Sequence, residues 1–438
     1  MVKKAIVFLC LAATLPACIS YYQRTADFNQ HFEQGEFEKA HKLLDKEDEP
    51  KEKNKLLHYL NLGTVNFMLQ NYEQSNKHFE DAYRLAETFY ENNLRTAASY
   101  LLNPRIKKYA GEDHEILLIN YYKALNYLYM GDKEAALVEC RRMNIQLNEI
   151  NDKYKRDNRY KRDAFIHLLM GLIYDANKDY NNAFIAYRNS YEIYKEDYQQ
   201  LFGIQPPKQL KQDLLRTAYL SGFDTEYDFY ERQFDMSYDP QKEKGKGKLV
   251  FLWHNGLGPF KDQVSVNFTL VRGEGGVATF TNEKYGWNFP FPNYSSKKEE
   301  KDGLGDVEII RMALPKYVER PAYYQSASLQ VGGNSYGLEM TENINDIAFQ
   351  SLEDRLLREL GNALIRLALK KATEHAIREE NENVGAAVGI FNAITEQADT
   401  RNWQTLPHSV YYARVPVDTG KINVQLKTRS YQNNTEEF

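Results

Sequence analysis

Two stretches of the sequence follow one pattern: YLNLGTVNFMLQNYEQSNKHFEDA (residues 59–82) and HLLMGLIYDANKDYNNAFIAYRNS (residues 167–190). Each carries, in the same order, a glycine, an aromatic, a small residue, a second aromatic and a second small residue: Gly63, Tyr72, Ser75, Phe79 and Ala82, then Gly171, Tyr180, Ala183, Tyr187 and Ser190. This spacing predicts a pair of antiparallel helices. The glycine lets the two helices approach closely, and the small residues lie where they cross. We expect the aromatics to fill the gap to the next pair.

Two weaker copies of the pattern, in residues 29–44 and 120–143, extend the repeat. The spacing is similar to that of the tetratricopeptide repeat, in which each unit of about 34 residues is one helix pair. We therefore predict an irregular tetratricopeptide-like α-solenoid of about four units over residues 25–235. Such solenoids present a concave groove that holds a peptide or another protein. The alternative is a packing scaffold whose groove holds no ligand.

The second half of the chain has a different character. Residues 236–247 lack apolar periodicity, which is typical of a linker. Beyond them, period-two alternation and β-forming residues predict strands within residues 248–260, 263–271, 277–280, 307–315, 326–331, 410–417 and 422–428. The charged segment at 295–303 is expected to be a solvated loop.

An amphipathic helix is predicted from Ile347 to Lys371, because its leucines recur at three and four positions. The small apolar segment Val384 to Ile394 is too short to span a bilayer, so we expect it to pack as a second helix through its glycines. Residues 248–425 are therefore predicted to form a mixed α/β domain with an inserted helical hairpin, and residues 426–438 a tail. The predicted fold class is a multidomain α + α/β protein.

The first residues indicate export. Residues 1–17 combine two lysines with a short apolar run, as secretory signal peptides do. The sequence LPAC that ends at Cys18 is typical of a bacterial lipobox, in which the cysteine receives acyl chains and anchors the protein to the membrane. We expect residues 18–24 to be a lipidated tether and the protein to face the periplasm from the outer membrane. The alternative is an ordinary secretory signal with a chance cysteine.

Composition gives no support for several other classes of partner and site. The net charge of -5 and the absence of a long basic run give no support for nucleic acid binding. Cys140 would remain as a lone cysteine after export, so we expect no disulfide framework. We expect Cys140 to be a buried apolar residue. The pair Arg141-Arg142 is interpreted as a solvated helix face, with an acidic partner as the alternative. The sequence indicates neither a cofactor nor a metal site.

The stretch ADTRNWQTLPHSVYYARV near the C-terminus holds the most varied chemistry. Asp399, Arg401 and Trp403 are interpreted as a structural corner between a helix and a strand, or as a partner-binding edge. The catalytic alternative is an envelope hydrolase acting on peptidoglycan or glycan. It requires a pocket in the second half that holds Asp399, Arg401 or His408 beside another carboxylate, or a cluster of His254, His408 and Asp399.

The chain as a whole resembles the uncharacterised tetratricopeptide-type lipoproteins of Gram-negative bacteria. The features that carry the resemblance are the lipobox, the helix pairs, and the segments NPRIKKYAGEDHE and ADTRNWQTLP. The resemblance implies a role in envelope maintenance or assembly and brings no catalytic residues. The leading prediction is a non-enzymatic outer-membrane lipoprotein that binds an envelope protein or peptide through its solenoid. The membrane, through the N-terminal lipid, is the other expected partner.

Overall fold

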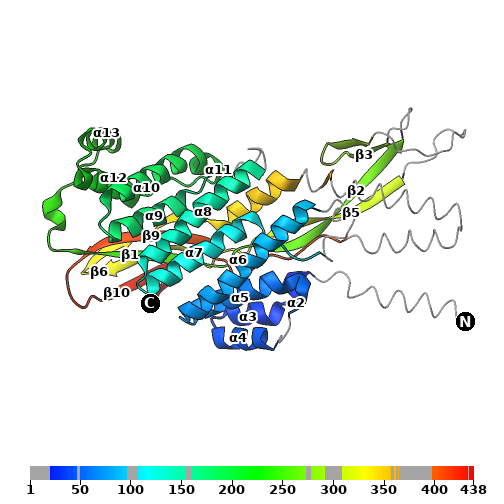
Figure 1. Ribbon diagram of the computed structural model, residues 1–438, viewed down its shortest axis with the longest axis horizontal. Coiled ribbons are helices and arrows are strands. Elements are labelled where there is room, and N and C mark those ends of the chain that lie inside the picture. Colours follow the sequence, from blue (N-terminus) through cyan, green and yellow to red (C-terminus); the bar gives the residue numbers. More distant parts are fainter. Residues whose placement is uncertain are drawn as a thin grey trace, which may run out of the picture.

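The computed structural model describes residues 20–46, 50–95, 107–153, 160, 162–272, 278–291, 308–356, 360–361, 364, 397–432 and 434–438. Residues 1–17, predicted as a signal peptide, lie outside the described residues, and so do Cys18, the predicted loop at 295–303 and the segment 384–394. The predicted tether at 18–24 is docked structure from Ser20 onward, since Ser20 caps α2 (Tyr21–Arg24) and the backbone N–H of Tyr21 donates to the hydroxyl of Thr400 at 3.0 Å. Helices fill the first half of the chain and antiparallel sheets most of the second (Figure 1).

Antiparallel helix pairs make up the first half. In the described part the pairs are α3 (Ala26–Glu33) with α4 (Phe37–Asp45), α5 (Lys55–Met68) with α6 (Tyr72–Arg95), α7 (Asp113–Tyr129) with α8 (Lys133–Lys153), α9 (Ala164–Ala176) with α10 (Tyr180–Ile193), and α12 (Lys208–Ser221) with α13 (Asp224–Phe234). Short helices flank or connect the pairs. They are α2 (Tyr21–Arg24) before α3, η2 (Glu52–Asn54) before α5, η4 (Tyr194–Tyr198) and α11 (Gln199–Leu201) between α10 and α12, and η5 (Pro240–Glu243) after α13. The array thus has five pairs where the sequence predicts about four.

The glycine and the small residue of the two best repeats have the predicted packing role, and the second aromatic packs on the glycine of its own pair. A Cβ added to Gly63 would lie 2.6 Å from the ring of Phe79, so only glycine allows this approach of α5 and α6. The hydroxyl of Ser75 donates to the carbonyl oxygen of Gly63 at 2.8 Å. In the later pair a Cβ on Gly171 would lie 2.4 Å from the ring of Tyr187. The helical half is therefore a tetratricopeptide-like array.

Within the described residues the strands form three sheets, all antiparallel, where the sequence predicts a mixed α/β domain. Their orders are β1-β9-β8, β11-β10-β6-β7 and β4-β3-β2-β5. The bounds are β1 Gly247–Asn255, β2 Phe260–Arg272, β3 Ala278–Asn282, β4 Trp287–Phe291, β5 Glu308–Val318, β6 Tyr324–Val331, β7 Asn334–Gly337, β8 Glu339–Asn343, β9 Ser409–Val417, β10 Val424–Ser430 and β11 Thr435–Glu437. Every segment predicted as a strand contains one. Residues 426–438, predicted as a tail, instead contribute β10 and β11 to the second sheet.

Alternation along β9 defines the layers of the molecule. Val410 and Tyr412 belong to the core formed with the helices. Tyr411, Ala413 and Val415 face the opposite way and pack against the second sheet. The first sheet therefore lies between the helices and the second sheet, and both of its faces are covered.

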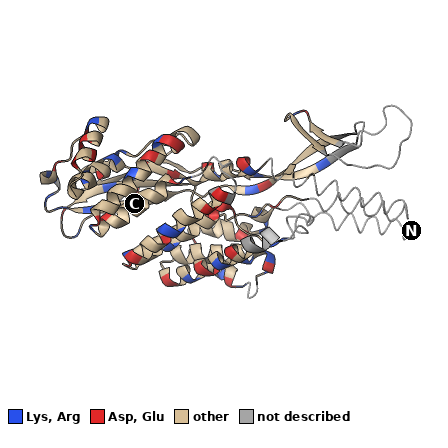
Figure 2. Cartoon of the chain, turned by 45° about the horizontal axis from the view of Figure 1, so that its top comes forward, with Lys and Arg blue, Asp and Glu red and all other residues tan. Residues whose placement is uncertain are grey.

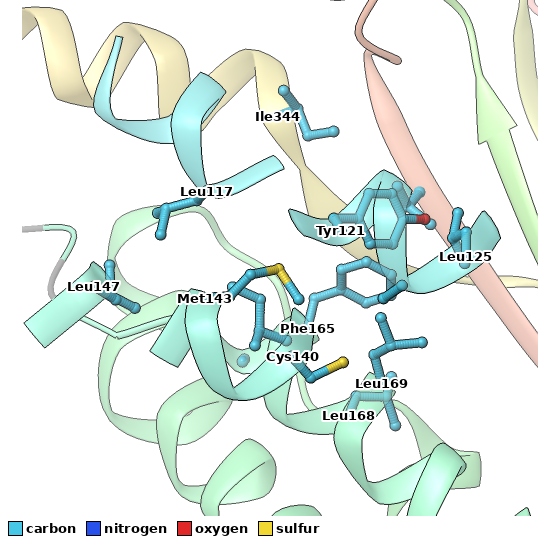
Figure 3. Packing of buried hydrophobic residues seen from close by; sticks show 14 of the residues in the cluster. Leu117, Tyr121, Leu125, Cys140, Met143, Leu147, Phe165, Leu168, Leu169 and Ile344 are labelled. Atoms are coloured by element: carbon cyan, nitrogen blue, oxygen red, sulfur yellow. The ribbon is translucent and has the colours of Figure 1, made fainter. Parts of the chain in front are cut away.

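One core joins the two halves of the chain. Ile344, Ile347 and Trp403 belong to the same cluster of buried residues as the helices α5 to α12. Figure 3 shows part of this core, where Cys140 lies beside Phe165, Leu168 and Leu169. Burial raises the pKa of the Cys140 thiol, which fits its predicted apolar role. The change at 236–247 is therefore a change of secondary structure and not a break in the core.

The third sheet extends from the body of the molecule. Its long strands β2 and β5 run toward the end opposite α13 (Figure 1). Phe268 and Met312 of this sheet are buried against Leu360 and Leu364, from the helix predicted after residue 347. That helix is described over 344–356 and at 360, 361 and 364.

Candidate functional site

Trp403 lies in the middle of the helical array, 1% exposed. Its backbone N–H donates to Oε1 of Glu115 in α7 at 2.7 Å. Its indole N–H donates to the hydroxyl of Thr64 in α5 at 3.1 Å, and its ring packs against Phe79 and Tyr122. The segment around Trp403 is thus held by two neighbouring helix pairs.

We define the inner face as the surface formed by the first helix of each pair: α3, α5, α7, α9 and α12. The C-terminal half of the chain bonds to all five of these helices. The contacts are Gln404 with Asn29 (2.9 Å), Trp403 with Thr64 and Glu115, His254 with Tyr121 (2.8 Å), Arg414 with Asp175, and Tyr412 with Asp213 (3.1 Å). The groove that the sequence predicts to hold a peptide is therefore covered by the protein's own chain.

Asp399 and Arg401 pair with each other beside this segment. The guanidinium of Arg401 donates to both carboxylate oxygens of Asp399, at 2.6 and 2.8 Å. It also donates to the carbonyl oxygen of Lys53 at 2.6 Å and lies over the ring of Tyr109. These contacts fix the chain before Trp403 against η2 and the start of α7.

Glu112 and Glu115, from the GEDHE stretch at the start of α7, form a buried ionic cluster with the second half. Lys261 of β2 and Arg355 both pair with Glu112. Although burial opposes it, the charges of Arg355 and Lys261 lower the pKa of Glu112 to about 2. Burial and the neighbouring Glu112 carboxylate raise the pKa of Glu115 to about 7. The two stretches that carry the family resemblance thus meet in space.

A second ionic network holds β9 on the later repeats. Arg414 pairs with Asp175 of α9 and, at 2.9 Å, with Asp213 of α12. Arg216 pairs with the same two carboxylates. All four side chains are at most 8% exposed. Two cations and two carboxylates balance, as buried charges require.

A pair of buried carboxylates, Asp163 and Glu342, lies next to a small enclosed cavity with room for about one water molecule. Tyr160 donates to Asp163 at 2.6 Å, and Tyr198 donates to Glu342 at 3.2 Å. Burial, with the nearby Asp163 as a further cause, raises the pKa of Glu342 well above its ordinary value. The cavity is too small for a substrate.

The histidines and carboxylate of the catalytic alternative do not come together. Asp399 is paired with Arg401, His254 contacts Tyr121, and Nε2 of His408 lies 3.3 Å from Glu319. The other nitrogen of His408 lies 3.2 Å from the hydroxyl of Ser409, so the order of groups is that of a hydrolytic triad. Ser409, however, is 1% exposed and starts β9. In the described part of the chain, the residues that the catalytic alternative names are therefore divided among separate contacts.

An open groove lies between α6 and α8, the second helices of two neighbouring pairs. We call it the outer groove. Its volume is ≈510 Å³ and it is lined by Glu73, Asn76, Lys77, Glu80, Arg84, Lys123, Tyr127, Ala135, Val138, Glu139 and Arg142. A second hollow shares Glu73, Asn76 and Tyr127 and continues the groove to Met130 and Asp132.

The floor of the outer groove is Lys123 of α7, 2% exposed. Its ammonium pairs with Glu80 at 2.7 Å and Glu139 at 3.1 Å. Arg84 and Arg142 lie on the rim and are more exposed. Arg84 pairs with Glu80, and Arg142 pairs with both Glu139 and Glu80. Sequence reasoning missed this site, although a lysine inside the apolar run YYKALNY was a signal for a paired internal charge.

Several kinds of site are absent from the described ranges. No group of three or more His, Cys, Asp or Glu side chains there is placed to hold a metal ion. In that same part of the chain, no helix has both the length and the apolar character that crossing a bilayer demands. Figure 2 shows lysines, arginines and acidic residues interspersed over the helices in that view.

Comparison with known proteins gives weak structural similarities. No protein-family model matches the chain, and no curated protein matches it either. Among solved structures, it is similar to the apo form of RapI (16% identity, TM-score 0.33, 49% of this chain and 68% of that one). It is also similar to BtubC from P. vanneervenii (12%, 0.34, 49% and 77%) and to MamA (14%, 0.30, 49% and 96%). The helix pairing, and not these similarities, identifies the repeats as tetratricopeptide-like.

Proposed function

We propose that this protein is a non-enzymatic lipoprotein of the outer membrane that binds an envelope protein or peptide and serves as a scaffold. The lipobox at Cys18 and the tetratricopeptide-like helix pairs support this function. The protein would face the periplasm, held by acyl chains on Cys18. It requires no cofactor.

One observation supports a particular binding site for the proposed partner. The inner face, which such arrays use for peptides, is covered by residues 399–415 of the same chain. The outer groove between α6 and α8 is open, and polar and charged side chains line it. We therefore place the partner segment in the outer groove.

The groove also indicates the chemistry of the partner. Lys123 on the floor is neutralised by Glu80 and Glu139, so it does not attract a further anion. Arg84 and Arg142 on the rim are 71% and 41% exposed and remain accessible to a carboxylate of a partner. Val138 adds an apolar contact, 45% exposed. These features fit a helix or extended segment with acidic and apolar side chains.

The test is capture of envelope proteins on the purified protein, with quantitation of each captured partner. Val138→Arg places a long charged side chain in the groove without touching the core. Ile185→Arg, at an equally exposed position in α10, is the matched control. We expect Val138→Arg to lose at least one partner that Ile185→Arg and the unchanged protein retain. Identical partner sets for all three proteins would exclude the outer groove.

Lipid attachment has its own test. Cells that express the protein are fed radioactive palmitate, and the purified protein is examined for label. We expect label in the unchanged protein and its loss in Cys18→Ser, with the protein then released in the soluble fraction. Unlabelled protein would overturn the anchor and leave the groove proposal standing.

A further inference from the structure

The first sheet ends at β1 on one side. Within the described residues, β9 is the only strand that pairs with β1, in an unbroken register over all of its residues. Successive residues of a strand direct their backbone groups to opposite sides, so every second residue of β1 points away from β9. In those same ranges, no backbone–backbone hydrogen bond joins that outer side to another segment. We call it the β1 edge.

β1 has the composition of a strand from the middle of a sheet. Leu249, Phe251 and Trp253 pack toward the second sheet, and Leu252 packs toward the helices. Strands with apolar residues on both faces usually have neighbours on both sides, whereas natural edge strands carry prolines, bulges or inward charges. Residues 249–253 contain none of these features. They are only partly buried, and Val250 is 41% exposed, so an added strand would complete both layers.

The sequence of β1 fits a second copy of itself. Its apolar run, LVFLW, is centred on Phe251. In an antiparallel pair of two β1 strands centred there, Leu249 lies opposite Trp253 of the other copy, and Val250 lies opposite Leu252. Directly opposed residues of an antiparallel pair point to the same face of the sheet. Apolar side chains therefore meet apolar side chains on both faces.

The charges around β1 favour the antiparallel arrangement. Residues 242–248 carry four lysines and one glutamate. A parallel pair would place the two lysine-rich segments side by side, whereas an antiparallel pair places them at opposite ends. Lys248 would then lie opposite His254 of the other copy. Burial lowers the pKa of His254 to about 4, so this imidazole is neutral at pH 7 and does not repel the lysine.

We propose that two copies of this chain form a two-fold symmetric dimer through antiparallel pairing of their β1 strands, with Phe251 on the axis. The two first sheets then become one continuous sheet with three strands from each copy. The contact is a single strand pair, so the dimer is weak in solution, with a Kd on the order of 10 μM. This inference goes beyond the proposed function and requires no acylation. It involves neither α6 nor α8, so it is tested separately from the outer groove.

Sedimentation equilibrium of the unacylated chain from Ile19 onward, between about 1 and 100 μM, tests the dimer. We expect the mean mass to rise from one chain toward two. Val250→Lys places a charge opposite Leu252 twice in each dimer and should raise the Kd at least about tenfold. Val424→Lys is the matched control, because Val424 is 39% exposed and β10 already lies between β11 and β6. It should leave the Kd unchanged, and thermal unfolding should show that both variants are folded.

Disulfide cross-linking tests the register. In Phe251→Cys the two cysteines oppose each other on the axis, with Cα atoms about 4.5–5.5 Å apart, so oxidation should link the copies. In Val250→Cys, the control, the two cysteines are diagonal neighbours about 7–8 Å apart and should link poorly. Cys140 is buried and does not compete.

Three results would each overturn the proposal: a monomer at every concentration, equal Kd values for Val250→Lys and Val424→Lys, or equal cross-linking of the two cysteine variants. If Val250→Lys does not fold, the cross-linking comparison decides, and if Phe251→Cys does not fold, sedimentation decides. A monomer whose Val250→Lys variant loses a captured envelope protein would overturn the dimer and assign the β1 edge to that partner.

Discussion

The carboxylate of Glu115 accepts a hydrogen bond from the backbone N–H of Trp403 at 2.7 Å, across 288 positions of sequence. The same carboxylate accepts from the hydroxyl of Tyr109 at 2.6 Å and from the backbone N–H of Glu112 at 3.1 Å. One buried acidic side chain therefore joins the start of α7 to the segment that fills the inner face. This contact explains why both stretches carry polar residues at positions that the core encloses.

Trp403→Ala should be strongly destabilising. The indole is 1% exposed, packs on Phe79 and Tyr122, and donates to Thr64. Removing it leaves a large cavity, and we expect a loss of about 3–5 kcal/mol in the free energy of unfolding. Urea denaturation followed by circular dichroism measures this loss. Tyr431→Ala, at a side chain 66% exposed, should change stability by less than about 0.5 kcal/mol. Similar losses for the two would contradict the buried role of Trp403.

The helix pairs could be predicted because their signals are local. Gly63 and Phe79 are sixteen positions apart on adjacent helices, so their spacing in the sequence already reflects their contact. The fifth pair, α12 with α13, was not predicted because its sequence does not repeat the order of small and aromatic residues found in the two best repeats. The strands were predicted for a related reason, since alternation at period two is visible within each one.

Gly63→Ala should destabilise the array although alanine favours helices. Alanine gains about 1 kcal/mol in helix propensity, but its Cβ would lie 2.6 Å from the ring of Phe79. Overpacking of this kind costs about 1–3 kcal/mol, so we expect a lower melting temperature. Gly361→Ala is the control, because its Cβ would meet no described atom within 4 Å. It should be neutral or slightly stabilising, and a gain of stability in both variants would refute the close approach.

The covering of the inner face was not predictable from the sequence. It depends on pairs such as Arg414 with Asp213, separated by 201 positions, and on which side of β9 faces the helices. The varied chemistry at 399–403 indicates that these residues matter, but their partners are in α5 and α7, far back in the chain. Periodicity gives the two faces of β9 without showing which element covers each. The ion pairs between the two halves of the chain form only when those halves pack together, so no local sequence pattern reveals them.

Arg414→Met should test the docking directly. Without the guanidinium, Asp175 and Asp213 would share only Arg216, which leaves an uncompensated buried charge. Breaking a buried ion pair typically costs about 3–5 kcal/mol. Arg311→Met is the matched control, since Arg311 is exposed and donates to Ser265. Chemical denaturation should show a large loss for the first variant and less than about 1 kcal/mol for the second. A stability of Arg414→Met equal to that of the control would show that the network contributes nothing.

His114 should make the protein sensitive to acid. Burial is the main cause that lowers the pKa of His114 to about 4, with the charges of Arg355 and Lys261 acting in the same direction. The unfolded chain takes up this proton near pH 6.5, whereas the folded protein does so only near pH 4. The stability from neutral His114 is therefore complete above pH 6.5 and falls by up to about 3 kcal/mol as the pH drops to 4. His114→Leu removes this proton uptake, so its unfolding free energy, measured by urea denaturation across that range, should fall less steeply with acid than that of the unchanged protein. Parallel pH profiles for the two proteins would mean that His114 is already protonated in the fold, or that its environment does not differ from the unfolded chain.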